Sequence, residues 1–132
     1  MQRPSPQRAI LLLAHGSRDP AWSAPFVKLR DKVASRAPDA VVANAYLEHT
    51  SPDVIDAARE AVAAGAKRIE IVPIFLGPGG HVRSDLPRLA AAVRETFAGV
   101  EVTLAAPIGE SEAVIDAIAA FCAAPEQLPA RF

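Results

Sequence analysis

The sequence has no long apolar run and only one cysteine. Its first apolar stretch, residues 9–14, is far shorter than the roughly 20 residues of a membrane-spanning helix, and it is also too short for the apolar part of a secretory signal. Cys122 cannot form a disulfide within the chain, and its helix-like surroundings predict a buried structural thiol. These absences predict a cytoplasmic protein without a membrane partner.

The charges are nearly balanced, with a formal net charge of -1. Nucleic acids and anionic membranes usually bind strongly basic surfaces, so neither is an expected partner. Apolar residues make up 51% and charged residues 22% of the 132 positions, which is typical of a globular domain rather than a disordered chain. We expect one domain, in which any charged ligand is bound by local groups.

Both common phosphate-binding motifs are missing. Gly77, Gly79 and Gly80 surround Pro78, but no lysine followed by serine or threonine ends this loop, and the spacing is not G-x-G-x-x-G. A nucleotide-binding role is therefore not expected. The sequence also lacks histidine-rich runs and cysteine clusters, so we predict neither a metal-storage tract nor an iron–sulfur centre.

The sequence does contain four apolar, strand-like runs, each followed by apolar residues at helical spacing. Four such units predict a single α/β domain with a flavodoxin-like, doubly wound sheet of about four parallel strands, helices on both faces and strand order 2-1-3-4. The expected strands are 9–14, 40–47, 69–76 and 100–104, and the expected helices begin near Ser23 and Ser51, run from Leu86 to Gly99, and cover 110–123.

This pattern also predicts the organisation of the chain. We expect a loose N-terminal arm over residues 1–8, where two prolines lie among polar residues, and the α/β domain over residues 9–124. Residues 125–132 are expected to form a C-terminal tail or a subunit contact.

Polar side chains follow three of the predicted strands. His15 comes directly after the first run, Glu48 after the second and His81 shortly after the third. The carboxyl ends of parallel strands line the ligand-binding edge of such a sheet, so we expect these side chains to face one crevice. Two imidazoles and a carboxylate suit a divalent metal ion and proton removal. The position of His81 just ahead of the third helix favours a neutral, metal-binding imidazole.

Neighbouring polar residues are candidates for binding an anionic ligand. Ser17 and Arg18 add a hydroxyl group and a planar cation, a pair that suits carboxylates. Arg83 and Arg88 either form a solvated face or flank an anionic substrate. His49 is open to interpretation as a third ligand, as a group that supports the site or as an exposed loop histidine, and the last is favoured.

Three ordered motifs resemble those of the small sirohydrochlorin chelatases, the cobaltochelatase and ferrochelatase group of the class II tetrapyrrole chelatases. The motifs are Leu-Ala-His-Gly-Ser-Arg at 13–18, Tyr-Leu-Glu at 46–48 with Ser-Pro at 51–52, and Val-Pro-Ile-Phe-Leu through Gly-Gly-His-Val-Arg-Ser-Asp-Leu-Pro at 72–87. The resemblance covers roughly residues 9–122.

The resemblance implies ATP-independent insertion of Co(II), Fe(II) or Ni(II) into sirohydrochlorin for cobalamin or siroheme biosynthesis, by a homodimer with no cofactor beyond the substrate metal ion. In such an enzyme His15 and His81 would hold the incoming metal, and Glu48 would accept protons. Because sirohydrochlorin is a polycarboxylate, loop cations, hydroxyl groups and amides are expected to receive its carboxylates. The residues expected to do so are Ser17, Arg18, Gly79, Gly80 and Arg83.

Gly77 and Gly80 depart from the family pattern, because bulkier residues are expected at these two positions in many relatives. The shape of the pocket wall and the fit of the substrate are therefore not carried over from the family.

Two other functions compete with the chelatase. A non-catalytic carrier of metal or tetrapyrrole would use the same crevice without turnover. A histidine phosphatase is disfavoured, because Ala14 stands before His15 and Gly16 where that class has a phosphate-binding arginine.

Overall fold

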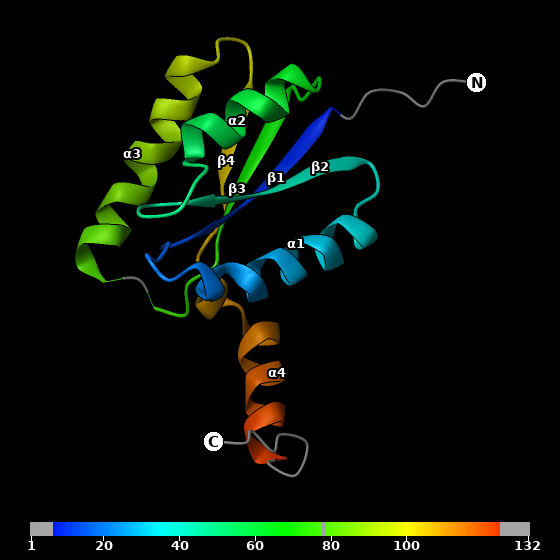
Figure 1. Ribbon diagram of the computed structural model, residues 1–132, viewed down its shortest axis with the longest axis vertical. Helices are drawn as coiled ribbons and strands as arrows, with labels where there is room; N and C mark the ends of the chain where they lie inside the picture. The colour runs from blue at the N-terminus through cyan, green and yellow to red at the C-terminus, as the bar shows by residue number, and fades with distance from the viewer. Residues whose placement is uncertain (1–6, 78, 125–132) are drawn as a thin grey trace.

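Each of the four apolar runs forms a strand of one sheet in the computed structural model, which describes residues 7–77 and 79–124 (Figure 1). The predicted tail and most of the predicted arm lie outside these residues. In chain order the elements, with η for a short 3-10 helix, are β1 (Arg8–Ala14), η1 (Pro20–Ser23), α1 (Ala24–Arg36), β2 (Ala40–Tyr46), α2 (Val54–Ala63), β3 (Arg68–Pro73), α3 (Gly80–Thr96), β4 (Glu101–Leu104), η2 (Ile108–Glu110) and α4 (Glu112–Ala123).

The strand order across the sheet is β2-β1-β3-β4, and all three strand pairs are parallel. The predicted α/β class and the predicted order 2-1-3-4 are therefore confirmed. β1 lies between β2 and β3, so residues 9–14 are all buried. A strand with neighbours on both sides and helices on both faces has no solvent-facing side, which explains its uninterrupted apolar run.

The register brings the ends of β1 and β2 level. Ala14 pairs with Tyr46 at the last position of the two strands. Backbone pairing continues past this point, because the N–H of Leu47 donates to the carbonyl of Ala14 at 3.0 Å. The N–H of Glu48 likewise donates to the carbonyl of His15 at 3.0 Å. The loops that follow these strands therefore leave the sheet side by side.

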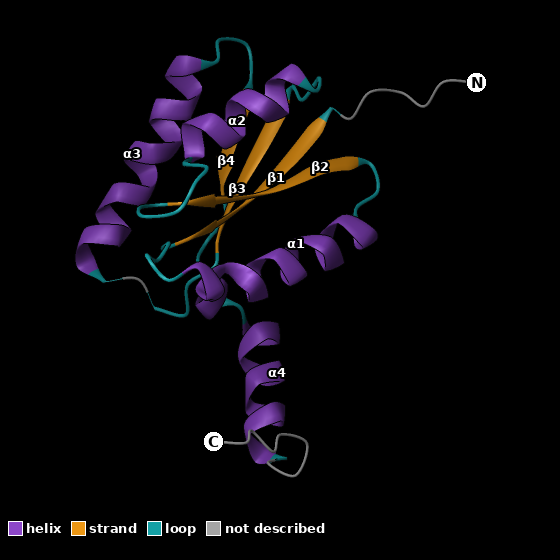
Figure 2. Cartoon of the chain, viewed as in Figure 1, coloured by secondary structure: helices purple, strands orange, loops and turns teal. Residues whose placement is uncertain are grey.

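Two apolar clusters hold the helices to the sheet, because successive side chains of a strand point to opposite faces. α2 and α3 cover one face and α1 covers the other (Figure 2). The buried strand residues of the larger cluster are Ala9, Leu11, Leu13, Ala45, Ile69, Ile71 and Val102, and the buried residues of the smaller cluster are Ile10, Leu12 and Val42. Each large aliphatic side chain buried in this way stabilises the fold by about 1.5–3 kcal/mol.

α3 begins earlier than the sequence predicts, at Gly80 rather than near Leu86. His81 consequently lies in the first turn of this helix and not ahead of it. Glycines favour a loop by local propensity, and Gly79 is indeed extended at the N-cap position. However, Val82 packs against the larger core, and this tertiary contact supports helical structure through a segment of weak propensity.

α4 projects away from the sheet instead of covering it (Figure 1). None of its residues is buried. Cys122 is exposed, so the predicted buried thiol is wrong, because the helix that carries it leaves the body of the domain. None of the helices in the described ranges has the length and apolar character needed to cross a membrane.

Candidate functional site

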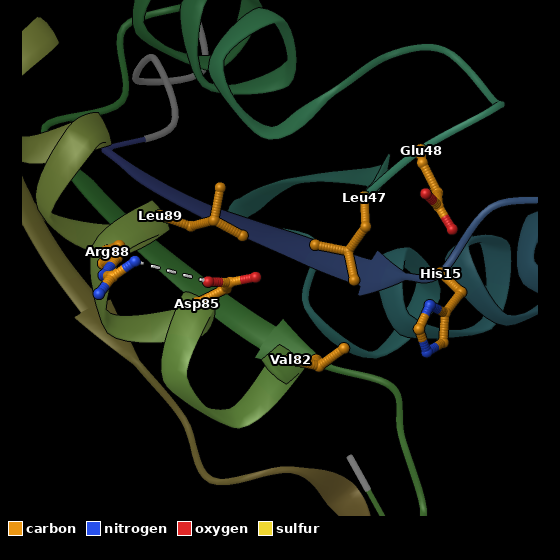
Figure 3. A pocket seen from close by; sticks show the side chains of 7 residues that line it. All are labelled: His15, Leu47, Glu48, Val82, Asp85, Arg88 and Leu89. Atoms are coloured by element: carbon orange, nitrogen blue, oxygen red, sulfur yellow. Dashed lines mark ion pairs between the residues drawn. The ribbon is translucent and has the colours of Figure 1, made fainter. Parts of the chain in front are cut away.

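A cavity of about 420 Å³ opens at the carboxyl edge of the sheet (Figure 3). This volume lies within the range of about 300–1,000 Å³ that is typical of small-molecule sites. The lining residues come from the loop after β1, the loop after β2 and one side of α3. They are His15, Leu47, Glu48, Val82, Asp85, Arg88 and Leu89.

Helical spacing explains which side of α3 forms a wall of the cavity, called the α3 wall below. Val82, Asp85 and Leu89 are three and four residues apart, so their side chains fall on the same face of the helix. Leu86 on the adjoining side is buried in the core and anchors this helix to the sheet. The apolar side chains of Val82, Leu89 and Leu47 give the cavity a surface suited to an aromatic ring system.

A close backbone contact joins the first two loops. Gly16 has a φ of 97°, and a β-carbon at this position would lie 1.7 Å from the carbonyl oxygen of Glu48. Thr50 adds a side-chain clamp: its Oγ1 accepts from the N–H of Ser17 and donates to the carbonyl of the same residue, both at 3.0 Å. These contacts hold His15 and Glu48 at a fixed spacing along adjoining backbones.

The two predicted functional side chains of these loops have different surroundings. The His15 ring packs against the buried ring of Phe75, with centroids 5.0 Å apart and planes tilted by 58°. The Glu48 side chain is 61% exposed and has His49 Nε2 3.8 Å from its Oε2. Nδ1 of the same histidine accepts from Arg18 Nε at 3.4 Å. His49 has a φ of 63°, a left-handed conformation that histidine adopts more readily than most residues.

The cavity holds charges of both signs. Glu48 is on one side, and Asp85 and Arg88 are on α3, where Oδ1 and Nη1 are 4.0 Å apart. Figure 3 shows Glu48 above His15, with the ion pair of α3 on the other side. Both partners of this pair are largely exposed, so the interaction is weak, and each group is available to a ligand.

The structure brings His15 and Glu48 to one cavity, whereas His81 is not among the residues that line it. His81 is exposed in the first turn of α3, next to Val82, which does line the cavity. In the described part of the chain, no group of three or more His, Cys, Asp or Glu side chains is close enough to hold a metal ion. The assignment of two imidazoles to the metal therefore stays a prediction.

The five residues predicted to bind substrate carboxylates lie outside the cavity lining. Ser17 Oγ accepts from the N–H of Asp19 at 3.1 Å, and Arg18 contacts the loop after β2. Gly79 and Gly80 form the exposed start of α3. The remaining member, Arg83, has its Nη1 3.7 Å from Glu110 Oε1. Their contact with substrate also stays a prediction.

The sequence alone did not predict Leu47, Val82, Asp85 or Leu89 as site residues. It left two interpretations of Arg88, as part of a solvated face or as a contact with an anionic substrate. The signal for the α3 residues is their spacing on one helical face. That signal becomes visible only when the helix is extended back to Gly80.

Comparison with known proteins gives consistent matches. The CbiX family model matches residues 9–123. A sirohydrochlorin cobaltochelatase of Methanocaldococcus jannaschii is 38% identical over 66% of this chain and 61% of its own length. A chloroplastic sirohydrochlorin ferrochelatase of Arabidopsis thaliana is 29% identical over 83% of this chain and 48% of its own. The chain thus spans less than two thirds of either relative.

A solved structure matches over nearly its whole length. The crystal structure of a CbiX protein from Marinobacter aquaeolei VT8 has a TM-score of 0.80 and 32% sequence identity to this chain. The match covers 91% of this chain and 98% of that protein. The fold described above is therefore shared with a chain of similar extent.

Proposed function

We propose that this chain, which belongs to the CbiX family, is a sirohydrochlorin chelatase that inserts a divalent metal ion without ATP. One observation carries the proposal: His15 and Glu48, which follow neighbouring strands, line the same cavity. The apolar side chains of Leu47, Val82 and Leu89 line it as well. An imidazole for the metal, a carboxylate for a proton and apolar side chains for a macrocycle are the groups that metallation requires.

In the proposed reaction, His15 and His81 hold the incoming metal ion with incomplete coordination, so that the ion can leave for the pyrrole nitrogens. Glu48 accepts a proton released from the macrocycle. Nitrogen and oxygen ligands accept Co(II), Fe(II) and Ni(II), and metal supply can decide among them.

The substrate carboxylates are proposed to meet Ser17, Arg18, Gly79, Gly80 and Arg83 around the mouth of the site. A guanidinium group binds a carboxylate through paired hydrogen bonds, and backbone N–H groups at a helix start also favour an anion. Arg88, which lines the cavity itself, is a further candidate.

The test is to mix the purified chain with sirohydrochlorin and Co(II) in the absence of ATP and to follow the absorbance change of metallation. We expect many turnovers per protein chain, and we expect replacement of both His15 and His81 by alanine to abolish the acceleration. A stoichiometric change without turnover would identify a carrier instead. Unchanged rates in the double variant would refute the assigned metal ligands.

We also propose that two copies associate through α4. This helix projects away from the sheet of its own chain (Figure 1), and it carries Ile115, Ile118 and Phe121, which are 43%, 37% and 51% exposed. A second copy is the expected partner, because covering these side chains would remove apolar surface from water on both protomers at once.

A further inference from the structure

Metallation releases two protons, and only one proton acceptor, Glu48, has been assigned so far; the inference drawn from this rests on the proposed function. A divalent ion that enters the uncharged tetrapyrrole core of the substrate replaces two N–H protons, so each turnover releases two protons. Of the cavity-lining groups that can accept a proton, His15 is assigned to the metal, and its lone pair is then engaged. Glu48 and Asp85 are the two carboxylates of the lining.

We propose that Asp85 accepts the second pyrrole proton. It belongs to the α3 wall, whereas Glu48 belongs to the loop after β2, so the two carboxylates approach a bound macrocycle from different elements. Figure 3 shows Leu47 between the two carboxylates and Val82 below them, so apolar side chains of the cavity lining separate the two acids. Two acceptors at separate places can serve two different nitrogens.

Arg88 makes this role depend on the presence of substrate. Its Nη1 is 4.0 Å from Asp85 Oδ1, and the side chains of the pair are 83% and 57% exposed. An exposed pair of this kind contributes little, and an incoming substrate carboxylate can compete for the guanidinium. Once Arg88 binds that carboxylate, the Asp85 carboxylate is released from its contact with Arg88 and can face a nitrogen of the bound macrocycle.

The protons balance in two consecutive transfers. One N–H bond breaks with transfer of its proton to Glu48, and the other breaks with transfer to Asp85, while the nitrogen electron pairs form bonds to the metal ion. Both carboxyl groups are largely exposed, so each returns its proton to solvent after the product forms. No oxidation or reduction takes place.

The test is steady-state metallation of sirohydrochlorin with Co(II) by the full chain and by Asp85→Asn, Glu48→Gln and the double variant. We expect Asp85→Asn to lower kcat by about 10²-fold or more, with the KM values for sirohydrochlorin and Co(II) nearly unchanged. Because consecutive transfers are limited by the slower one, we expect the double variant to be within about twofold of the slower single variant.

Glu95→Gln is the matched control, because Glu95 is an exposed acid of the same helix outside the cavity lining, and it should leave kcat unchanged. A raised KM for Co(II) with unchanged kcat in Asp85→Asn would make Asp85 a metal-binding group and overturn the proposal. So would a double variant whose loss is the product of the single losses. An active wild-type chain with a fully active Asp85→Asn variant refutes this inference alone, whereas an inactive wild-type chain refutes the proposed function as well.

A second variant tests the exchange of partners at Arg88. Arg88→Met keeps the aliphatic stem and removes the charge. We expect a raised KM for sirohydrochlorin that responds less to added salt than the wild-type KM, because one of several charged contacts with substrate is lost. An unchanged KM would show that Arg88 does not receive a substrate carboxylate.

Discussion

The backbone of Gly16 lies against that of Glu48, so closely that a β-carbon on residue 16 would stand 1.7 Å from the Glu48 carbonyl oxygen. The contact occurs one residue after His15, whose carbonyl accepts a hydrogen bond from the N–H of Glu48 at 3.0 Å. The spacing between the proposed metal ligand and the proposed base is therefore set by main-chain packing rather than by their exposed side chains.

Gly16→Ala should consequently destabilise the fold and the site together. Both the left-handed φ of 97° and the clash with Glu48 oppose a β-carbon. Gly99→Ala is the matched control, because Gly99 has a φ of 83° but no atom within 4 Å of the added carbon. We expect the free energy of unfolding, measured in urea, to fall by about 1–3 kcal/mol more for Gly16→Ala than for the control. Equal losses would show that the close contact relaxes without cost.

The Thr50 clamp offers a second prediction. Thr50→Val has nearly the same shape but removes both hydrogen bonds to Ser17, whereas Thr50→Ser keeps the hydroxyl group. We expect the valine variant to lose about 1–3 kcal/mol of unfolding free energy, because the partly buried N–H and carbonyl of Ser17 are left without this partner. We also expect kcat for metallation to fall. Wild-type values for the valine variant, measured by thermal unfolding and initial rates, would show that the clamp is dispensable.

The exposed apolar side of α4 predicts a concentration-dependent assembly. Phe121→Glu places a charge in the proposed contact and should convert a dimer to a monomer in multi-angle light scattering. The variant should leave the fold of each protomer intact, because Phe121 is 51% exposed within its own chain. Val27→Glu on α1, where Val27 is 45% exposed, is the matched control. If Val27→Glu abolished the dimer and Phe121→Glu did not, the interface would lie on α1 and not on α4.

Tyr46 should make the stability depend on alkaline pH. Its side chain is almost fully buried at the end of β2, and burial raises its pKa above the usual 10.0. The neutral phenol is thus favoured in the folded state. Below about pH 10 both states are protonated and the full stability is present, whereas at higher pH the unfolded chain ionises first and stability is lost.

Urea unfolding at several alkaline pH values compares the wild-type chain with Tyr46→Phe, which cannot ionise. We expect the free energy of unfolding to fall more steeply above about pH 10 in the wild-type chain. Parallel slopes would show that Tyr46 ionises with the same pKa in both states. Other groups that titrate in this pH range contribute equally to both proteins. Subtracting one free energy of unfolding from the other at each pH therefore isolates the contribution of Tyr46.

Part of the site follows from local patterns. His15 and Glu48 each come directly after an apolar run, and parallel strands end at a common edge, so their convergence is predictable once the order β2-β1 is known. Asp85 and Arg88 lie within a helix; Asp85 falls in the third motif and Arg88 is a possible substrate contact, but their local sequence does not place either side chain in the cavity. Their assignment depends on where the helix starts and on which of its faces meets the cavity.

α4 shows the same limit at the scale of a whole element. Its apolar residues at helical spacing predict a helix, and the helix forms, from Glu112 to Ala123. The same residues also predict burial, which is wrong for Cys122 within this chain. Apolar residues at helical spacing indicate that one face of a helix is stabilised by burial. They do not indicate whether the same chain or another chain buries that face.

The amino-acid sequence alone determined the four strand-helix units, the parallel sheet order and the two loop residues that bear an imidazole and a carboxylate, because these depend on periodicity and on strand ends. Only the tertiary structure decided that α3 starts at Gly80, that its face with Asp85 and Arg88 closes the cavity, and that α4 stands apart. Those outcomes depend on contacts between segments distant in the chain, whose energies outweigh the weak local preferences of glycine-rich and apolar stretches.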